Sequence, residues 1–207
     1  MASTTDPQAG PPAPAADRHA APPEGAAAAE RLVLLLGGAR SGKSALAVRW
    51  GRAYAGPVRF VATGQAGDDE MRLRIARHRA ERPAAWETVE EPRDPAAAVA
   101  SAAPGALVIV DCLTLWLANV LERDDAAILA AGAALTAAAR GRAGPTVVVS
   151  NEVGWGIVPA DPGTRRYRDL LGTVNARVAD AAARTLLLVA GRALTLGPAP
   201  SRPTEVF

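Results

Sequence analysis

The sequence predicts an α/β fold in which a mostly parallel sheet is sandwiched by helices. From residue 31 onward, short apolar runs alternate with longer stretches of helical periodicity, which is typical of a parallel sheet covered by helices. Runs such as LVLLL and TLLLV lack the alternation of half-exposed strands, so both of their faces are expected to be buried. The segment GGARSGKS follows the first run and precedes a helical stretch, which predicts a P-loop.

Each expected strand is a short apolar run followed by small or polar residues. The strands are expected at 31–36, 58–63, 106–111, 146–150 and 185–190, with short edge strands near 86–90 and 194–196. The helices are expected at 43–55, 68–81, 95–102, 113–121, 125–140 and 163–183. Because open parallel sheets bind ligands beyond the carboxyl ends of their strands, functional side chains are expected there.

The chain divides into one folded unit and two tails. Residues 1–30 are mainly Ala, Pro and small polar residues, which bury too little surface to offset their ordering entropy, so a disordered tail is expected. The P-loop domain is expected over 31–196, followed by a short tail over 197–207. No run reaches the ~18 apolar residues of a membrane span, and the single cysteine, Cys112, excludes an internal disulfide. A cytoplasmic protein is therefore expected.

The composition argues against a nucleic-acid binder. The formal net charge is only +2 and aromatic residues make up 4% of the chain, whereas nucleic-acid binders concentrate basic and stacking side chains. Of the 23 basic residues only Lys43 is a lysine, and it lies in the P-loop. A compact, mobile ammonium at this one place indicates a chemical need that a planar guanidinium does not meet.

The P-loop supplies the first candidate nucleotide-binding residues. Its glycines let the backbone wrap around phosphates, and successive amides with the helix N-terminus donate hydrogen bonds to them. Lys43 adds charge on the outer phosphates and is a catalytic candidate, while Ser44 is a candidate ligand of Mg²⁺. The alternative is a glycine-rich turn that binds nothing. The candidates are Gly37, Gly38, Ala39, Arg40, Ser41, Gly42, Lys43 and Ser44.

Two acidic residues follow other strands. Asp111 ends the run ALVIVD and is a candidate nucleotide-binding residue and Mg²⁺ ligand, although a helix N-cap before Leu113 gives the same pattern. Glu152 follows TVVVSN and is a catalytic candidate that orders a water or accepts a proton, the alternative being a hydrogen-bonded strand terminus. Three arginines of the last long helix fit either a phosphate clamp or a solvated face, namely Arg165, Arg166 and Arg168.

His78 lies in a strongly charged helical segment, DDEMRLRIARHRAERPAAW. A lone histidine on a charged helix is usually a solvated surface residue. The alternative is a nucleophile, because a neutral imidazole attacks phosphorus, and nearby basic residues disfavour its protonation and attract an anionic substrate. The basic neighbours are Arg77, Arg79 and Arg82. Both interpretations remain open from the pattern alone.

Four segments together resemble a known enzyme family. They are GGARSGKS, ATGQAGDDEMRLRIARHRAERPAAWETVEEP, VDCLTLWLANVL and SNEVGWGIVPADPGTRRYRDLLGTVNARVADAA, in this order. Over residues 31–192 the chain is similar to the bifunctional adenosylcobinamide kinases and adenosylcobinamide-phosphate guanylyltransferases of cobalamin biosynthesis. The most specific features are HRxxRPxxW and NEVGxGIVP. The chain departs from the family only in its two tails, which touch no motif.

The resemblance implies two reactions at one nucleotide site. The first is phosphorylation of adenosylcobinamide with ATP or GTP, and the second is transfer of GMP from GTP to the product, giving adenosyl-GDP-cobinamide and pyrophosphate. By its position in HRxxRP, His78 would carry the GMP covalently, and Glu90 would contact the nucleotide. The resemblance also implies a P-loop fold of the RecA-like type, assembled as a homotrimer, with Mg²⁺ as the expected cofactor.

Two other functions are weighed against this one. A regulatory GTPase or ATP-driven switch is disfavoured, because NEVG stands where a guanine-reading NKxD segment is expected and no DxxG follows Asp111. A degenerate homologue without activity is disfavoured by the intact P-loop, Asp111 and His78. A nucleoside triphosphate and a corrinoid are therefore the expected partners.

Overall fold

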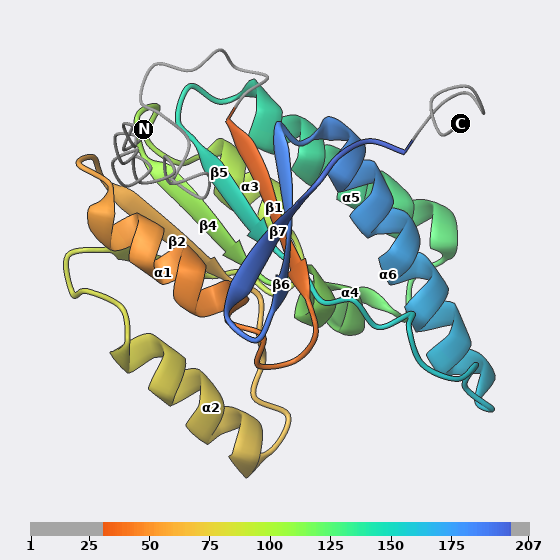
Figure 1. Cartoon of the computed structure of the whole chain (residues 1–207). Helices are drawn as coiled ribbons and strands as arrows, with labels where there is room; N and C mark the ends of the chain where they lie inside the picture. Colours follow the sequence, from red (N-terminus) through yellow and green to blue (C-terminus); the bar gives the residue numbers. More distant parts are fainter. Residues whose placement is uncertain (1–30, 200–207) are drawn as a thin grey trace, which may run out of the picture.

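The computed structural model describes residues 31–199. Strands and helices alternate along this part of the chain (Figure 1). The strands are β1 (Leu32–Gly37), β2 (Val58–Ala62), β3 (Glu87–Glu90), β4 (Leu107–Asp111), β5 (Thr146–Val149), β6 (Arg184–Val189) and β7 (Arg192–Leu196). The helices are α1 (Lys43–Ala53), α2 (Asp69–Ala80), α3 (Pro95–Ala100), α4 (Leu113–Val120), α5 (Asp125–Gly141) and α6 (Pro162–Ala181).

The strands form one seven-stranded sheet in the order β3-β2-β4-β5-β1-β6-β7. All neighbouring strands run parallel except β7, which pairs antiparallel with β6. The P-loop strand β1 is therefore internal, and β5 separates it from β4, which ends at Asp111. This topology confirms the predicted mostly parallel sheet.

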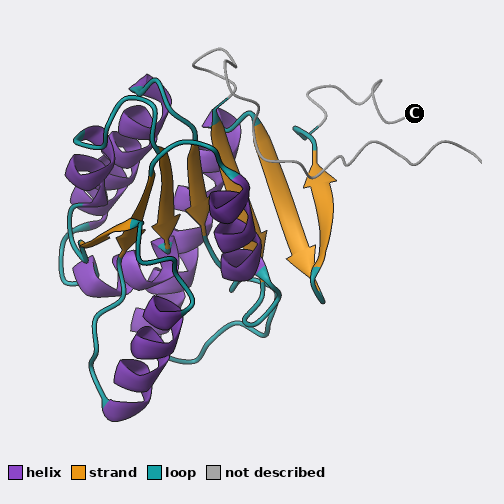
Figure 2. Ribbon diagram, turned by 90° about the vertical axis from the view of Figure 1, so that its left-hand side faces the viewer, coloured by secondary structure: helices purple, strands orange, loops and turns teal. Residues whose placement is uncertain are grey.

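Helices cover both faces of the sheet (Figure 2). Leu32, Leu34 and Leu36 of β1 pack with residues of α3, α4, α5 and α6, whereas Val33 and Leu35 pack on the opposite face with α1. Burying each such side chain contributes roughly 1.5–3 kcal/mol, which is why these strands carry unbroken apolar runs. Helix α2 buries no residue and lies beside the carboxyl-terminal edge of the sheet (Figure 1).

The predicted elements are all present, and their ends differ from the expected ones by at most two residues. The edge strand expected at 194–196 begins at Arg192, because a tight turn at Ala190 and Gly191 folds β7 back on β6. Both turn residues have positive φ, 49° and 74°. Alanine rarely adopts this conformation, so the residue pattern at 190–191 does not predict a hairpin.

The expected tail over 1–30 and most of the expected tail over 197–207 lie outside the described residues. The last strand, β7, ends at Leu196. None of the helices in the described part of the chain combines the length and the apolar character that a membrane crossing requires.

Candidate nucleotide-binding and group-transfer site

The P-loop joins β1 to α1 in a tight turn that requires glycine. Gly37 and Gly42 have φ values of 145° and 102°, a region that favours glycine. A Cβ on Gly37 would lie 2.3 Å from the Leu188 carbonyl oxygen and 2.8 Å from Ser41 Oγ. From the β6–β7 turn, the amide of Gly191 donates to the Ser41 carbonyl at 3.0 Å. The loop is thus supported from behind, and its tip faces solvent at Gly38, Ala39 and Arg40.

Lys43 is buried at the start of α1. Its ammonium donates to the carbonyl oxygens of Gly37 and Gly38 at 2.9 and 2.8 Å, with a longer contact of 3.4 Å to Ser41 Oγ. Burial lowers the pKa of Lys43, and the nearby carboxylate of Asp111 acts in the opposite direction. The three acceptors all belong to the loop, so the ammonium lies within the phosphate cradle that the sequence predicts.

Ser44 and Asp111 connect α1 to the end of β4. The Ser44 hydroxyl donates to the Asp111 carboxylate. Burial raises the pKa of Asp111, whereas the Ser44 hydrogen bond and the nearby basic groups oppose that shift. The N-cap of α4 is Cys112, so Asp111 does not serve as the helix cap that the sequence left open. Cys112 is buried, which raises its pKa to about 11 and keeps the thiol protonated.

Ser44 and Asp111 could hold a magnesium ion only together with other ligands, such as phosphate oxygens of a bound substrate. Mg²⁺ takes oxygen ligands and is usually held by one or two carboxylates together with substrate phosphates. Within residues 31–199, no group of three or more His, Cys, Asp or Glu side chains could hold a metal ion. The hydroxyl and carboxylate therefore match the protein's share of a phosphate-dependent Mg²⁺ site.

His78 lies on the face of α2 that points toward the sheet. Along α2, only Met71, Ile75 and His78 are half-buried, and their spacing of four and three residues places them on one side of the helix. Helix α2 follows the carboxyl end of β2, and β2 pairs with β4, which ends at Asp111. The structure thus brings His78, Asp111 and the P-loop to the same edge of the sheet.

Two aromatic contacts anchor the segment that follows α2. The Arg82 guanidinium lies over the Phe60 ring, 3.7 Å from its centroid. Trp86 packs on Gly51 of α1, where an added Cβ would lie 2.4 Å from the indole ring. We call Arg82 and Trp86 the α2 clamp, because together they fix the end of the helix that carries His78.

The positioning role of Arg82 and Trp86 is not predicted by the sequence pattern. Arg82 and Trp86 belong to the HRxxRPxxW motif, but the motif does not say what they contact. A further signal is Gly51 in the middle of α1, since an interior helical glycine costs roughly 1 kcal/mol relative to alanine unless a close contact requires it.

A cavity of about 400 Å³ lies beside the α2 clamp. Its lining includes both clamp residues and Arg79. Arg79 forms an ion pair of 3.0 Å with Glu90 at the end of β3, where both side chains are well exposed. Glu90, which the family resemblance implies as a nucleotide-binding residue, does not line this cavity. It lies near the cavity because it pairs with Arg79, which is a lining residue.

Glu152 follows β5, between the ends of β4 and β1. Its backbone amide donates to the Gly37 carbonyl at 3.2 Å, which ties the residue to the P-loop. The preceding Asn151 is held from two sides: its amide donates to Thr114 Oγ1 at 3.0 Å, and its carbonyl accepts from Asn175 Nδ2 at 3.1 Å. The backbone of Glu152 is thus a bonded strand terminus, while its side chain borders a hollow beside the P-loop.

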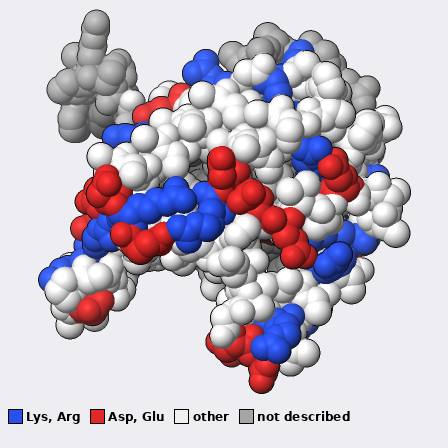
Figure 3. Space-filling view, turned by 180° about the vertical axis from the view of Figure 1, so that it is seen from behind, with Lys and Arg blue, Asp and Glu red and all other residues white. Residues whose placement is uncertain are grey.

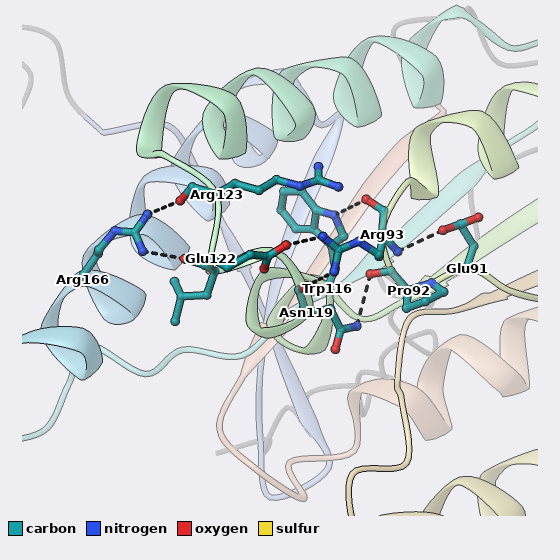
Figure 4. Close-up of polar contacts among 9 residues, drawn as sticks. Glu91, Pro92, Arg93, Trp116, Asn119, Glu122, Arg123 and Arg166 are labelled. Atoms are coloured by element: carbon teal, nitrogen blue, oxygen red, sulfur yellow. Dashed lines mark hydrogen bonds and ion pairs between the residues drawn. The ribbon is translucent and has the colours of Figure 1, made fainter.

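Helix α4 ties the neighbouring strand ends together behind the site. Asn119 Nδ2 donates to the Thr63 carbonyl at 2.7 Å. It also donates to the Pro92 carbonyl at 3.2 Å (Figure 4). The Thr63 hydroxyl in turn donates to the Cys112 carbonyl and accepts from the Cys112 amide, both at 2.7 Å. These bonds fix the ends of β2 and β4 relative to each other, which gives the VDCLTLWLANVL segment a positioning role.

The arginines at the start of α6 make structural contacts. Arg166 donates to the carbonyl oxygens of Leu121 and Arg123 in the α4–α5 loop (Figure 4). Arg165 donates to two carbonyls of the preceding loop, and Arg168 pairs with the adjacent aspartate. These contacts favour a structural role over the phosphate clamp.

The charges on the side opposite to the view of Figure 1 are mixed. Basic and acidic side chains lie next to one another over this face (Figure 3). Nucleic-acid surfaces concentrate positive charge to neutralise phosphates. This face therefore gives no support to a nucleic-acid partner.

Comparison with solved structures finds similarity at the level of fold. An ATPase of a bacterial type III secretion system is 12% identical with a TM-score of 0.49, covering 77% of this chain and 51% of that chain. The flagellar accessory protein FlaH of Methanocaldococcus jannaschii is 13% identical with a TM-score of 0.46, covering 80% of this chain and 77% of that one.

Comparison with protein families and curated proteins is more specific. The family described as cobinamide kinase / cobinamide phosphate guanyltransferase matches residues 33–196. The bifunctional adenosylcobalamin biosynthesis protein CobP of Pseudomonas aeruginosa is 46% identical over 169 residues, covering 81% of this chain and 98% of that protein. The corresponding protein CobU of Escherichia coli is 37% identical over 178 residues, with coverages of 77% and 96%. The chain therefore belongs to the cobinamide kinase / cobinamide phosphate guanyltransferase family, as its four sequence segments predicted.

Proposed function

We propose that the chain phosphorylates adenosylcobinamide with ATP or GTP and then transfers GMP from GTP to the product, at one nucleotide site. The observation that carries this proposal is the convergence of His78, Asp111 and the P-loop at one edge of the sheet. Membership in the family supports a nucleoside triphosphate and a corrinoid as the two substrates. Relatives that share most of the chain are named as bifunctional proteins of adenosylcobalamin biosynthesis.

In the kinase step, the hydroxyl oxygen of the corrinoid attacks the γ-phosphorus. An O–P bond forms, the bond from phosphorus to the β–γ bridging oxygen breaks, and a nucleoside diphosphate leaves. The P-loop amides and Lys43 stabilise the charge on the phosphate oxygens throughout this transfer. Glu152 accepts the proton of the attacking hydroxyl.

In the guanylyl step, an imidazole nitrogen of His78 attacks the α-phosphorus of GTP. A P–N bond forms and the bond from the α-phosphorus to the α–β bridging oxygen breaks. Pyrophosphate leaves on the P-loop side, and the imidazole ring gives up one proton. A phosphate oxygen of the phosphorylated corrinoid then attacks the same phosphorus, the P–N bond breaks, and the ring takes a proton back. The covalent intermediate divides one difficult displacement into two easier ones.

Other residues hold the nucleotide for both steps. Ser44 and Asp111 would hold Mg²⁺ together with phosphate oxygens, and the bound ion supplies positive charge to the phosphate chain. Glu90 contacts the nucleotide from beside Arg79. We further propose that residues 31–196 are the folded domain, that the chain assembles as a homotrimer and that it acts in the cytoplasm.

A product assay tests this function. The protein is incubated with adenosylcobinamide and either ATP or GTP, and the corrinoid products are separated. We expect phosphorylated product with at least one nucleotide and GDP-linked product only when GTP is present. A protein that binds GTP but forms neither product would contradict the proposal and revive the regulatory-switch alternative.

A further inference from the structure

A second hollow, of about 440 Å³, lies against the P-loop on the side away from α2. Helix α2 follows β2, whereas the hollow is bounded by segments that follow β5, β1 and β6, and β4 separates these strands from β2. The lining residues are Gly38, Ala39, Arg40, Ser41, Glu152, Trp155, Leu188, Val189 and Ala190. The P-loop thus has the charged helix on one side and this hollow on the other.

The outer wall of this hollow is apolar and exposed. The Trp155 side chain is 73% exposed and Val189 is 57% exposed. In the same loop as Trp155, Ile157 and Val158 are exposed by 97% and 63%. Neighbouring exposed apolar side chains of this kind mark ligand or partner surfaces, and a tryptophan offers a large rigid face for stacking.

The chemistry of the proposed guanylyl step requires the acceptor to approach from the P-loop. In an in-line displacement, the attacking and leaving groups lie on opposite sides of the phosphorus. If His78 attacks from α2, pyrophosphate leaves toward the P-loop. The corrinoid phosphate that later displaces His78 must then arrive from the side where pyrophosphate lay.

The kinase step requires the same approach. Its acceptor attacks the γ-phosphorus, which is the end of the triphosphate chain remote from the α-phosphate that His78 attacks. In both steps, the corrinoid therefore reaches the phosphates from the side of the P-loop that faces away from α2.

We propose that the hollow is the corrinoid acceptor site, in which Trp155 stacks on the flat face of the macrocycle. This inference rests on the proposed function. A corrin ring carrying amide groups gains most from apolar contact and needs little charge neutralisation, and the charged residues of the lining are only Arg40 and Glu152. Glu152 belongs to the same hollow, so one site holds the ring and brings the acceptor hydroxyl to its proposed base.

Kinetics with adenosylcobinamide test the role of Trp155. We expect Trp155→Ala to raise the KM for adenosylcobinamide in the kinase reaction about tenfold, because stacking is lost. Trp155→Phe should restore the KM to within about threefold, since an aromatic face remains. The control Leu194→Ala removes a side chain of similar exposure, 61%, from β7, outside the hollow, and should leave the KM unchanged.

Labelling of the protein by GTP separates the two hypotheses, because it requires no corrinoid. If the label forms in Trp155→Ala as in the wild type while the KM rises, both hypotheses stand. An unchanged KM overturns the acceptor site, and an unchanged KM with an altered oligomer mass assigns the exposed loop to a subunit contact.

If the wild type neither takes the label nor converts adenosylcobinamide, the proposed function fails. Equilibrium dialysis of adenosylcobinamide then tests the hollow alone, and equal dissociation constants for wild type and Trp155→Ala contradict it.

Discussion

Helices α1 and α2 serve the same edge of the sheet but are held in opposite ways. Helix α1 buries five of its residues, among them Lys43, and so forms part of the core. Helix α2 buries none and is held near its ends, by the Asp68 side chain that caps its first turn and by the α2 clamp, Arg82 and Trp86. The proposed phosphate-binding half of the site is therefore built into the core, while the half with the proposed nucleophile depends on a few peripheral contacts.

The largest effect is expected on the α1 side. Lys43→Ala removes the one ammonium from the proposed phosphate cradle, so both reactions should fall by about 10²–10³-fold, the size of effect seen when a preorganised charge-stabilising group is lost. Lys43→Arg should not restore them, because a planar guanidinium does not fit the point contact. Rates of both product-forming steps measure this. A loss below tenfold in either step would show that the two reactions do not share the cradle.

The α2 clamp tests the other half of the comparison. Trp86→Ala removes a half-buried ring from Gly51 and should lower the free energy of unfolding by about 2–3 kcal/mol. Labelling by GTP should slow more than the kinase step, because only labelling depends on the position of α2. Trp86→Phe is the matched control and should retain most of both properties. If GTP labelling and the kinase step slow equally, then α2 does not act in the labelling step alone, which contradicts the proposed division between the two helices.

The charged carboxylate of Asp111 is expected to lower the stability of the folded protein at neutral pH. Because burial raises the pKa of Asp111, the folded protein binds this proton more tightly than the unfolded chain does. Its contribution to stability is thus present below the ordinary pKa and is lost as the pH rises through the raised value. At pH 7, Asp111→Asn should raise the Tm by about 2–4 °C for each kcal/mol by which the free energy of unfolding increases. The rates of both reactions should fall in the same variant.

Thermal unfolding at several pH values measures this effect. The Tm difference between Asp111→Asn and the wild type should disappear below the ordinary aspartate pKa of 3.8. A variant less stable than the wild type at pH 7 would contradict the inference that the folded protein disfavours the charged form of Asp111.

Substitutions at two helical glycines test the packing of Trp86 on α1, and their expected effects on stability are the smallest. In α6, Gly172 has no heavy atom within 4 Å of an added Cβ, so Gly172→Ala should stabilise the protein by about 0.5–1 kcal/mol through helix propensity. In α1, Gly51→Ala should destabilise it, because the added Cβ would meet the Trp86 ring at 2.4 and 2.6 Å. Denaturant unfolding measures both. A Gly51→Ala variant at least as stable as the wild type would mean that Trp86 does not pack closely on α1.

The sequence predicted what depends on local pattern. The strands were identified because core strands buried on both faces carry unbroken apolar runs, and the P-loop because its glycines meet fixed steric demands, such as the contact of Gly37 with the Leu188 carbonyl. Contacts between distant segments could not be predicted from pattern. The stacking of Arg82 on Phe60, the packing of Trp86 on Gly51 and the hollow beside Trp155 depend on how elements dock.

The interpretation of His78 shows the same limit. Its helix has few apolar residues, and Leu73 does not share a face with Met71 and Ile75, so the pattern does not indicate clearly which side meets the sheet. The structure settles the orientation through the half-buried residues Met71, Ile75 and His78. The chemistry of His78 was inferred from the family resemblance and stays a proposal.

Incubation with GTP labelled at the α-phosphate tests the central claim most directly. The account predicts acid-labile, alkali-stable label on the wild-type protein and no label on His78→Ala, which should still bind GTP and phosphorylate adenosylcobinamide. Equal labelling of the two proteins would contradict the role of His78 and remove the reason for separating a phosphate-binding helix from a nucleophile-bearing one.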